Sequence, residues 1–568
     1  MKKLFFTALL VVITGILYAE TADSRPNILL LLTDDQGYAD LGCHGNPVLK
    51  TPTIDRFSKE GTEFTRFYVS PVCAPTRASL MTGRYNYRTG VTDTWFGRST
   101  MAAEEFTLAE ALQQAGYATG LFGKWHLGDT YPYRPEDQGF DEVLRHRGGG
   151  IAQPSCPPGN SYFSPLLLHN GKMEKFSGYC MDIYTDSVIR FIEANKGNPF
   201  FAYLATNTPH SPLQVSDAYA DPYRKKGLAE ETAKAYGMIA NIDDNFARVL
   251  AKLDELGLSK NTLVIFMTDN GPRIFSPDRF TGILRGKKGD VFEGGIHVPF
   301  FIRWPGHVEP GKKVDTLAAH IDLMPTLLDA CGIQLPQTNP LDGISLMPLL
   351  RNEKTTDPNR TLYFQWHRGN APSSYRNFAA VKQQYKLLQN QNHHQAERPL
   401  KFELFNLQDD LAETTDIAGQ HPEILEQMKA DYDRWFSDVS STREFSPSPA
   451  WIGTTHENPV VLTQQDRKGA EHWGNGTYYP NAYWPVRVIT EGKFTCTMRF
   501  YTPLNSRGRA FLKIGDRVLK ERVDEGADAY TFKTTHLGKG DTTLTAWVES
   551  DSQKVSPRFL DITFETQE

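Results

Sequence analysis

Continuous runs of apolar residues that end abruptly in polar residues recur through the first half of the chain. The run at 27–33 lies between turn-forming residues, and the run at 262–268 repeats its pattern. Such a run is typical of a strand buried on both faces, as in a parallel sheet covered by helices. Two shorter runs, at 117–123 and 199–205, have the same character. The pattern therefore predicts four strands of a buried, mostly parallel sheet.

Helical periodicity appears between these runs. Residues 108–117 and 184–195 carry apolar side chains at the three- and four-residue spacing of an amphipathic helix. Strands that alternate with helices form a mixed, mostly parallel sheet between two helical layers. The alternation extends over residues 26–350, which we assign to one α/β domain.

The rest of the chain divides into two further units. Residues 351–440 include a segment that starts at Glu403 and a helix at 423–436, and we expect this smaller subdomain to pack beside the main sheet. Over residues 441–568 helical periodicity stops, and short runs of alternating apolar positions are separated by Gly and Asp turns. That pattern predicts an all-β sandwich domain.

Polar side chains follow each of the four predicted strands. They are Asp34 and Asp35, Lys124 and His126, Asn207 and His210, and Asp269 and Asn270. A single Asp after a strand is more often a turn former or a helix cap, but two such pairs at equivalent strand ends favour a shared site. Because ligands bind beyond the carboxyl ends of strands in open α/β sheets, we expect these groups in one crevice.

Composition and charge narrow the function classes. The chain has 568 residues and a formal net charge of −6, so more than one domain is expected and nucleic-acid binding is disfavoured. Two lysines and an apolar stretch at 4–17 indicate a secretory signal peptide over residues 1–19. The stretch is too short for a good membrane span, and no cysteine follows it to carry a lipid. We therefore expect a periplasmic or secreted protein.

Six cysteines are too few for a disulfide framework in a chain of this length. Export to an oxidising compartment still allows one bridge, and Cys156 with Cys180 is the best pair because both flank a loop rich in Pro and Gly. Two unrelated thiols are an equally good interpretation of the same pair.

The segment from Cys73 to Arg84, CAPTRASLMTGR, has the strongest chemical signature in the chain. Pro75 lies in the first turn of a predicted helix, and Arg77 follows Cys73 by one turn, so the two side chains can share a face. At a helix N-terminus the dipole and the free N–H groups favour negative charge on a nucleophile or a bound anion. A lone cysteine near Pro and Arg is usually a buried or disulfide-bonded thiol, so Cys73 by itself does not establish a nucleophile.

CAPTRASLMTG resembles the signature of the type I sulfatases, in which a Cys followed by x-Pro-x-Arg is oxidised to formylglycine. Residues 26–439 are similar throughout to the arylsulfatase family of the alkaline phosphatase superfamily. The resemblance implies an alkaline-phosphatase-like α/β fold, 3-oxoalanine (formylglycine) at position 73, and a formylglycine-generating maturase as a partner during biogenesis. It also implies hydrolysis of sulfate esters with release of inorganic sulfate.

The resemblance assigns a metal site and a set of catalytic groups. The implied metal ligands are Asp34, Asp35, Cys73 as formylglycine, Asp269 and Asn270. The implied catalytic residues are Cys73, Arg77, Lys124, His126, His210, Asp269 and Lys288. Three carboxylates and an amide make a hard oxygen site suited to one Ca²⁺ ion, with Mg²⁺ second. The binuclear zinc of related phosphatases would need histidine ligands and a Ser or Thr nucleophile, which these positions lack.

The mechanism of the family, which the resemblance implies, assigns a proton-transfer step to Asp269, to His210 with Lys288, and to His126. The hydrated formylglycine is a geminal diol, and Asp269 accepts a proton as one hydroxyl attacks sulfur. His210, with Lys288, protonates the departing alcohol. His126 removes the proton of the second hydroxyl, which expels sulfate from the sulfoenzyme intermediate and restores the aldehyde.

The sequence indicates the substrate less directly than the reaction. The signal peptide, the β domain and loops rich in Trp, His and Arg favour exolytic removal of sulfate from a sulfated carbohydrate. Candidate substrate contacts in these loops are Trp95, Arg98, His146, Arg147, His367 and Arg368. Two alternatives stay open: a phosphonate or phosphate ester hydrolase of the same superfamily, and a carbohydrate-binding protein that keeps the fold without turnover.

Overall fold

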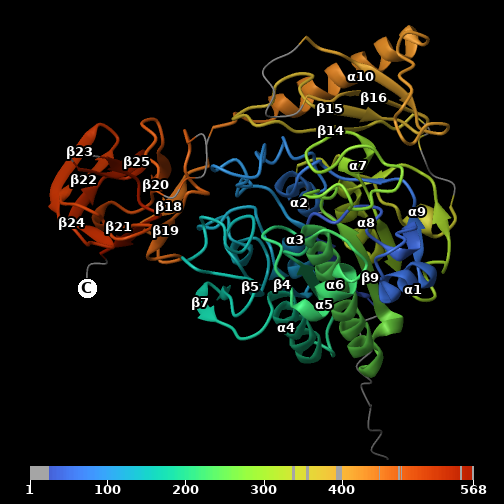
Figure 1. The fold of residues 1–568 in the computed structure, drawn as a ribbon, viewed down its shortest axis with the longest axis horizontal. Coiled ribbons are helices and arrows are strands. Elements are labelled where there is room, and N and C mark those ends of the chain that lie inside the picture. The colour runs from blue at the N-terminus through green and yellow to red at the C-terminus, as the bar shows by residue number, and fades with distance from the viewer. Residues whose placement is uncertain are drawn as a thin grey trace, which may run out of the picture.

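The computed structural model describes residues 25–565 except 335–338, 354–356, 358, 392–398, 447, 471–473, 475, 551 and 552. It shows a large α/β unit, a small sheet with helix α10 (Pro422–Ser441) beside it, and an all-β unit drawn in red (Figure 1). The signal peptide expected over residues 1–19 lies outside the described residues. Within the described part, no helix combines the length and the apolar character needed to cross a bilayer.

A ten-stranded mixed sheet forms the centre of the α/β unit. In sheet order its strands are β12 (Lys313–Val314), β2 (Thr62–Phe64), β11 (Phe300–Arg303), β9 (Thr262–Thr268), β1 (Asn27–Thr33), β8 (Phe200–Ala205), β4 (Ala118–Gly123), β5 (Glu142–Arg145), β6 (Leu166–His169) and β7 (Lys172–Lys175). The inner strands β9, β1, β8, β4 and β5 are parallel, and antiparallel pairs flank them on both sides. The four apolar runs of the sequence are four of these five parallel strands.

Helices cover both faces of this sheet because the side chains of β1 alternate between two apolar cores. Ile28, Leu30 and Leu32 pack with α2 (Cys73–Thr82), α3 (Leu108–Gln114), α8 (Leu323–Ala330) and α9 (Met347–Leu350). Leu29 and Leu31 pack with α1 (Pro52–Glu60), α4 (Cys180–Ala194), α5 (Asp217–Arg224) and α6 (Glu230–Glu255). Burial of one such side chain contributes about 1.5–3 kcal/mol, which fixes β1 in the middle of the sheet. The predicted fold class is confirmed.

Local signals explain where two of the predicted helices begin and end. Thr107 caps α3, since its side chain accepts the Glu110 N–H at 3.1 Å while the Glu110 carboxylate accepts the Thr107 N–H at 2.8 Å. Helix α2 ends at Gly83, which adopts a left-handed φ of 67° that glycine tolerates. The helix expected to start at residue 184 begins four residues earlier, at Cys180, because the burial pattern of α4 extends to that position.

A small antiparallel sheet lies beside the α/β unit and carries α10. Its strands are β14 (Leu362–Gln365), β15 (Phe378–Val381), β16 (Tyr385–Gln389) and β17 (Glu403–Asn406). Phe378, Leu387 and Leu404 pack against Met428 and Tyr432 of α10. A short helix and a three-stranded sheet share a core with β14 to β17 and so join the two units: α7 (Glu293–Ile296), β10 (His297–Val298), β3 (Phe67–Tyr68) and β13 (Ala318–Ala319).

The C-terminal unit is a sandwich of two sheets. One contains β18 (Ala450–Ile452), β20 (Trp484–Val488), β25 (Gly540–Glu549), β22 (Gly508–Ile514), β23 (Arg517–Val523) and β26 (Lys554–Val555). The other contains β19 (Val460–Leu462), β27 (Phe559–Phe564), β21 (Gly492–Arg499) and β24 (Ala529–Leu537). Alternate residues of β21, namely Phe494, Cys496 and Met498, face the common core, as the period of two predicted.

Cys156 and Cys180, considered above as a disulfide, are two separate buried thiols. Cys156 Sγ lies 3.6 Å from the Gly150 carbonyl oxygen, and Cys180 begins α4. Burial raises the pKa of both thiols, to about 11 for Cys156. The interpretation of the pair as unrelated thiols is therefore the one that the structure supports.

Lys386 on β16 is a buried cation that joins the small sheet to the α/β unit. Its Nζ lies 2.8 Å from Glu293 Oε1 at the start of α7 and 2.8 Å from Glu413 Oε1 in the loop after β17. Tyr68 and His297 contact the other oxygen of Glu293 at 3.0 and 2.9 Å. Two buried carboxylates thus depend on one ammonium for their neutralisation.

Replacement of Lys386 by Met should destabilise the protein, because Glu293 and Glu413 would face each other without a cation. Removal of one partner of a buried ion pair costs about 3–5 kcal/mol, and we expect the free energy of unfolding to fall by that amount. Urea denaturation measures the change. Lys401→Met is the control, since the Lys401 side chain is 75% exposed and its ion pair with Glu403 contributes little. Equal stability of the two variants would refute this role of Lys386.

Candidate active site

Four neighbouring strands deliver polar side chains to one edge of the sheet. In the order β9, β1, β8 and β4 the strands are parallel, so their carboxyl ends lie together. Backbone hydrogen bonds between neighbouring segments continue just beyond the strand ends. The Asp34 N–H donates to the Thr208 carbonyl and the Asp269 N–H donates to the Thr33 carbonyl, both at 3.1 Å. The buried groups gathered there are Asp34, Asp35, Lys124, His126, Asn207, His210, Asp269 and Asn270.

Two of these residues adopt a left-handed backbone. The φ angle is 66° at Asp35 and 64° at His126, in a region that costs a residue with a side chain about 1–2 kcal/mol. Strain of this kind persists where the surrounding structure fixes a functional side chain. The strained backbone after β1 and β4 therefore indicates that Asp35 and His126 are held in place for a function.

Helix α2 brings Cys73 to the same edge. All ten residues of the helix are buried, and Cys73, its first residue, is 2% exposed. Arg77 donates from Nε and Nη2 to Asp269 Oδ2 at 3.1 and 2.7 Å, and from Nη1 to the Lys124 carbonyl at 2.9 Å. Arg77 therefore fixes the Asp269 carboxylate close to the N-terminus of the helix.

Two lysines pair with the remaining carboxylates. Lys124 Nζ lies 2.8 Å from Asp34 Oδ2, and Lys288 Nζ lies 2.5 Å from Asp35 Oδ1. Burial alone would raise the pKa of Asp35, but Lys288 and other nearby cations hold it below its ordinary value. Burial and the charge of Asp34 raise the pKa of Asp269 above its ordinary value. Asp269 is thus the carboxylate best suited to accept a proton.

Both histidines at the strand ends are neutral, because burial lowers the pKa of His126 well below its ordinary value and that of His210 to about 3. His126 Nε2 lies 2.8 Å from the Thr94 carbonyl oxygen, and Nδ1 lies 3.4 Å from Cys73 Sγ. A carbonyl only accepts, so Nε2 carries the proton and the Nδ1 lone pair faces Cys73. His210 Nδ1 donates to the Ser211 carbonyl at 2.6 Å. Each ring offers the site an unprotonated nitrogen.

The buried oxygens at this edge that have no hydrogen-bond partner among the described residues include Asp34 Oδ1, Asp35 Oδ2 and Asn270 Oδ1. Asn270 Nδ2 donates to Asp35 Oδ1 at 2.8 Å, which leaves the amide oxygen free. Ligand atoms of Asp34, Cys73 and Asp269 lie within 4.8 Å of one another. Unpaired buried carboxylate oxygens are costly, and hard oxygen donors suit Ca²⁺ or Mg²⁺. The residues therefore fit one divalent cation.

Three of the expected substrate contacts gather around Asp93, a fully buried carboxylate. Arg368 Nη1 lies 2.7 Å from Asp93 Oδ1, and Arg98 Nη1 lies 3.5 Å from Oδ2. The Arg368 guanidinium also lies over the Trp95 ring, 4.0 Å from its centroid. The same loop carries the Thr94 carbonyl that binds His126, so the cluster adjoins the strand-end groups. Two guanidinium groups on one carboxylate leave a net positive charge there.

The loop of His146 and Arg147 lies against His126. A Cβ on Gly149 would lie 2.7 Å from His126 Cε1, so only glycine allows this approach. His146 is buried, its Nδ1 lies 2.9 Å from the Arg147 carbonyl oxygen, and burial lowers its pKa to about 3. His146 Nε2 and Arg147 Nη1 are buried and have no hydrogen-bond partner among the described residues. Both residues thus keep polar atoms that a ligand can use.

His367, the last of the expected contacts, is engaged within its own loop. Its Nε2 accepts the Ser373 N–H at 3.0 Å, and burial lowers its pKa to about 4. Sequence reasoning missed Asp93 and Thr94. Asp93 is an isolated acidic residue with no motif around it, and Thr94 acts through its backbone carbonyl, which no pattern of side chains can mark.

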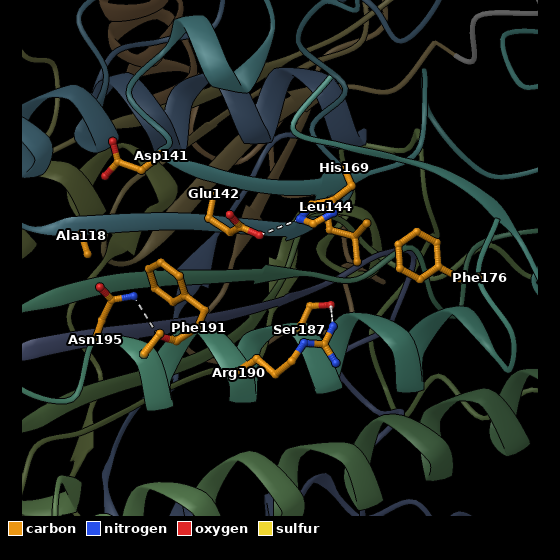
Figure 2. A pocket seen from close by; sticks show the side chains of 11 residues that line it. Ala118, Asp141, Glu142, Leu144, His169, Phe176, Ser187, Arg190, Phe191 and Asn195 are labelled. Carbon is orange, nitrogen blue, oxygen red and sulfur yellow. Dashed lines mark hydrogen bonds and ion pairs between the residues drawn. The ribbon is translucent and has the colours of Figure 1, made fainter. Parts of the chain in front are cut away.

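A cavity of about 510 Å³ opens at the opposite end of the sheet (Figure 2). It lies beside Ala118 and Glu142, the first residues of β4 and β5, whereas Lys124 and His126 follow β4 at its other end. His169 and Glu142 pair across it at 2.8 Å. The cavity contains none of the site residues expected from the sequence, so the candidate active site lies elsewhere.

Known proteins resemble the chain over the region that carries this site. The Sulfatase family model matches residues 26–333, and the model for the C-terminal part of N-sulphoglucosamine sulphohydrolase matches residues 287–435. N-acetylgalactosamine-6-sulfatase from Sus scrofa is 34% identical over 397 residues, which cover 64% of this chain and 72% of that protein. Arylsulfatase A from Bos taurus is 33% identical over 470 residues, which cover 72% of this chain and 89% of that protein.

A solved structure extends the similarity to the fold. The crystal structure of Ps i-CgsB in complex with k-i-k-neocarrahexaose matches 75% of this chain and 95% of its own, with 30% sequence identity and a TM-score of 0.66. The Sulfatase model spans more than half of the chain and includes the four strand ends, α2 and the loop of Lys288. The chain therefore belongs to the sulfatase family.

Proposed function

We propose that this sulfatase removes sulfate from a sulfated carbohydrate, with a formylglycine formed from Cys73 as its nucleophile. As a member of its family, the chain hydrolyses sulfate esters. One observation carries the finer proposal: Cys73 Sγ lies 3.4 Å from Nδ1 of the neutral His126 and within 4.8 Å of carboxylate oxygens of Asp34 and Asp269. A nucleophile at this position has a base on one side and cation-binding oxygens on the other.

The proposed modification explains why a cysteine lies at the start of α2. A hydrated formylglycine supplies one hydroxyl that attacks sulfur and a second whose deprotonation lets sulfate leave, and burial raises the pKa of the unmodified Cys73 thiol. A formylglycine-generating maturase is the partner that this chemistry requires during biogenesis. The expected signal peptide at residues 1–19 supports a periplasmic or secreted location.

Two residues accept protons from position 73 in this proposal. Asp269 takes the proton of the attacking hydroxyl, because burial and Asp34 raise its pKa and Arg77 fixes its orientation. His126 takes the second proton at Nδ1, because its Nε2 proton is committed to the Thr94 carbonyl.

Protonation of the leaving alcohol falls to His210 and Lys288. His210 Nδ1–H is bound to the Ser211 carbonyl, which turns Nε2 toward Asp35, 3.8 Å from its Oδ2. Although burial lowers the pKa of Lys288, the Asp35 carboxylate raises it above its ordinary value, so the lysine holds a proton at neutral pH. Because His210 Nε2 carries no proton before the reaction, we propose that Lys288 supplies the proton and that His210 Nε2 passes it to the leaving oxygen.

We propose Ca²⁺ as the ion of the oxygen site, held by Asp34, Asp35, Asp269, Asn270 and the modified residue 73. When bound, it would act as a Lewis acid that offsets the charge of the sulfate oxygens. The ion pairs of Arg77, Lys124 and Lys288 keep cationic groups on the same edge. Together with the N-terminus of α2, they stabilise negative charge that develops in the transition state.

The cluster around Asp93 supports a carbohydrate substrate bound at its end. Arg98 and Arg368, which lie beside the Trp95 ring, offer guanidinium groups for a sulfate, carboxylate or hydroxyl. His146 and Arg147, whose loop lies against His126, add polar atoms that have no hydrogen-bond partner among the described residues. N-acetylgalactosamine-6-sulfatase is named for a sugar sulfate and Ps i-CgsB was solved with an oligosaccharide, which supports the same substrate class here.

Co-expression with an active maturase should convert Cys73 and lower the mass of the peptide FYVSPVCAPTR by about 18 Da. The converted protein should release sulfate from a panel of sulfated oligosaccharides, measured by ion chromatography. Cys73→Ser should complete at most one turnover, because a serine ester of sulfate lacks the second hydroxyl. An unconverted thiol would refute the nucleophile, and faster release of phosphate from matched phosphate or phosphonate esters would favour that class of hydrolase.

His210→Gln should discriminate between leaving groups. Acid catalysis contributes about 10²–10⁴ to a rate, so kcat should fall by that factor for a sugar sulfate, whose alkoxide needs a proton. For 4-nitrophenyl sulfate the loss should stay below about tenfold, because nitrophenolate leaves without one. His169→Gln, in the cavity at the opposite end of the sheet, is the control and should keep full activity. Equal losses on both substrates would exclude His210 from leaving-group protonation.

Removal of the metal should lower thermal stability. A ligand at 100 times its Kd adds about 2.7 kcal/mol, so dialysis against EGTA should lower the unfolding temperature and Ca²⁺ should restore it. Mg²⁺ at the same concentration should restore less, since Mg²⁺ usually keeps several of its waters and is rarely held by a set of protein oxygens alone. Asp35→Asn should weaken the response to Ca²⁺. A response to Ca²⁺ that is identical in this variant would place the ion elsewhere.

A further inference from the structure

The turn that follows β19, residues 463–466, belongs to the C-terminal sandwich but contacts the active site. In Figure 1, β19 lies on the side of the sandwich that faces the α/β unit. Gln465 in this turn is 6% exposed, and its Nε2 donates to the Thr94 carbonyl at 2.8 Å and to Ser99 Oγ at 2.9 Å. The same nitrogen lies 3.5 Å from His126 Nε2. Both nitrogens carry protons, so their proximity reflects a shared acceptor, the Thr94 carbonyl.

The Thr94 carbonyl controls which nitrogen of His126 can act as a base. It accepts the Nε2 proton at 2.8 Å and so leaves the Nδ1 lone pair directed at Cys73. A carbonyl oxygen has two lone pairs, and here His126 uses one and Gln465 uses the other. Thr94 lies outside the helices and strands, so no sheet or helix hydrogen bond fixes the direction of its carbonyl. Gln465 supplies that constraint.

Several hydrogen bonds define the shape of the turn itself. The N–H and the hydroxyl of Thr463 donate to Asp466 Oδ2 at 2.8 and 2.9 Å, and Trp484 Nε1 on β20 donates to the Thr463 carbonyl at 2.6 Å. The Gly97 N–H donates to the Gln465 carbonyl at 2.5 Å. Gly97 has a φ of 68°, and a Cβ there would lie 3.3 Å from the Asp466 carbonyl oxygen. The close approach of the two segments thus fits a glycine at this position.

We propose that Gln465 is a positioning residue for His126, and that the C-terminal sandwich therefore completes the active site. The proposal rests on the role proposed above for His126. It extends the site to a part of the chain beyond both family matches, which end at residues 333 and 435. Gln465 acts through the Thr94 carbonyl, which keeps the His126 ring in one tautomer and one orientation. In metal sites, mutation of a residue that hydrogen-bonds to a ligand without touching the metal lowers affinity or activity by about 10–100-fold.

The test compares two glutamines of the same turn. Gln465→Met removes the donors to Thr94 and Ser99 but keeps the length of the side chain. Gln464→Met is the matched control, because Gln464 is also buried but its Nε2 donates to Gly474 within the sandwich, at 2.7 Å. With the best substrate of the oligosaccharide panel, kcat should fall about tenfold in Gln465→Met, with KM within twofold. Gln464→Met should keep both constants within twofold.

A second readout does not depend on activity. Nitrogen NMR of protein labelled at histidine distinguishes a ring nitrogen that carries a proton from one with a lone pair, and a His126→Ala sample identifies the signals. In the wild-type chain with unconverted Cys73, His126 should be protonated at Nε2 alone. In Gln465→Met both tautomers should appear. Gln465→Ala replaces this variant if the Met variant does not fold.

Three outcomes would overturn the proposal. Equal losses of kcat in the two Met variants would show that the turn only contributes to the packing between the sandwich and the α/β unit. An unchanged kcat in Gln465→Met would show that Gln465 has no role in catalysis. A single unchanged tautomer of His126 in Gln465→Met would show that Gln465 does not position the ring. Full activity of His126→Ala would instead refute the proposed role of His126. The tautomer measurement tests the effect of Gln465 on the ring independently of that role.

Discussion

The neutralisation of three buried carboxylates is the constraint on which this active site depends. Asp34, Asp35 and Asp269 lie fully inside the protein, and each pairs with one cation from a different part of the chain: Lys124, Lys288 and Arg77. The three ion pairs balance, so together they add no net charge to this edge of the sheet. A divalent ion on the remaining oxygens would shift the balance to positive, which is the condition under which a sulfate ester binds.

This constraint also explains why the site lies at the strand ends. Parallel strands bring their carboxyl ends to one edge, and α2 points its N-terminus at the same edge, so charges from distant segments meet there. Lys288 reaches this edge on the long loop between β9 and α7. The sandwich adds a contact to the same edge through Gln465. Asp34 and Gln465 thus lie at the same edge although most of the chain separates them.

The sequence predicts much of this arrangement because burial leaves a clear pattern. The run at 262–268 coincides with β9, and the polar residues after the strands do meet at one edge. The order of the strands and the separate thiols of Cys156 and Cys180 depend on tertiary packing, which no local pattern encodes. The contacts of Thr94 and Gln465 escape prediction for a different reason: one acts through its backbone, and the other is a single polar residue in a remote β domain.

The complete burial of α2 has a consequence for the biosynthesis of the enzyme. Every residue of this helix is buried and Cys73 is only 2% exposed, so the segment around Cys73 cannot enter the active site of another enzyme once the α/β unit has closed around it. If residue 73 is modified as we propose, folding and modification compete for the same nascent segment. A chain that folds before modification retains the Cys73 thiol permanently. The fraction of active enzyme in a preparation is then set during synthesis and does not change afterwards.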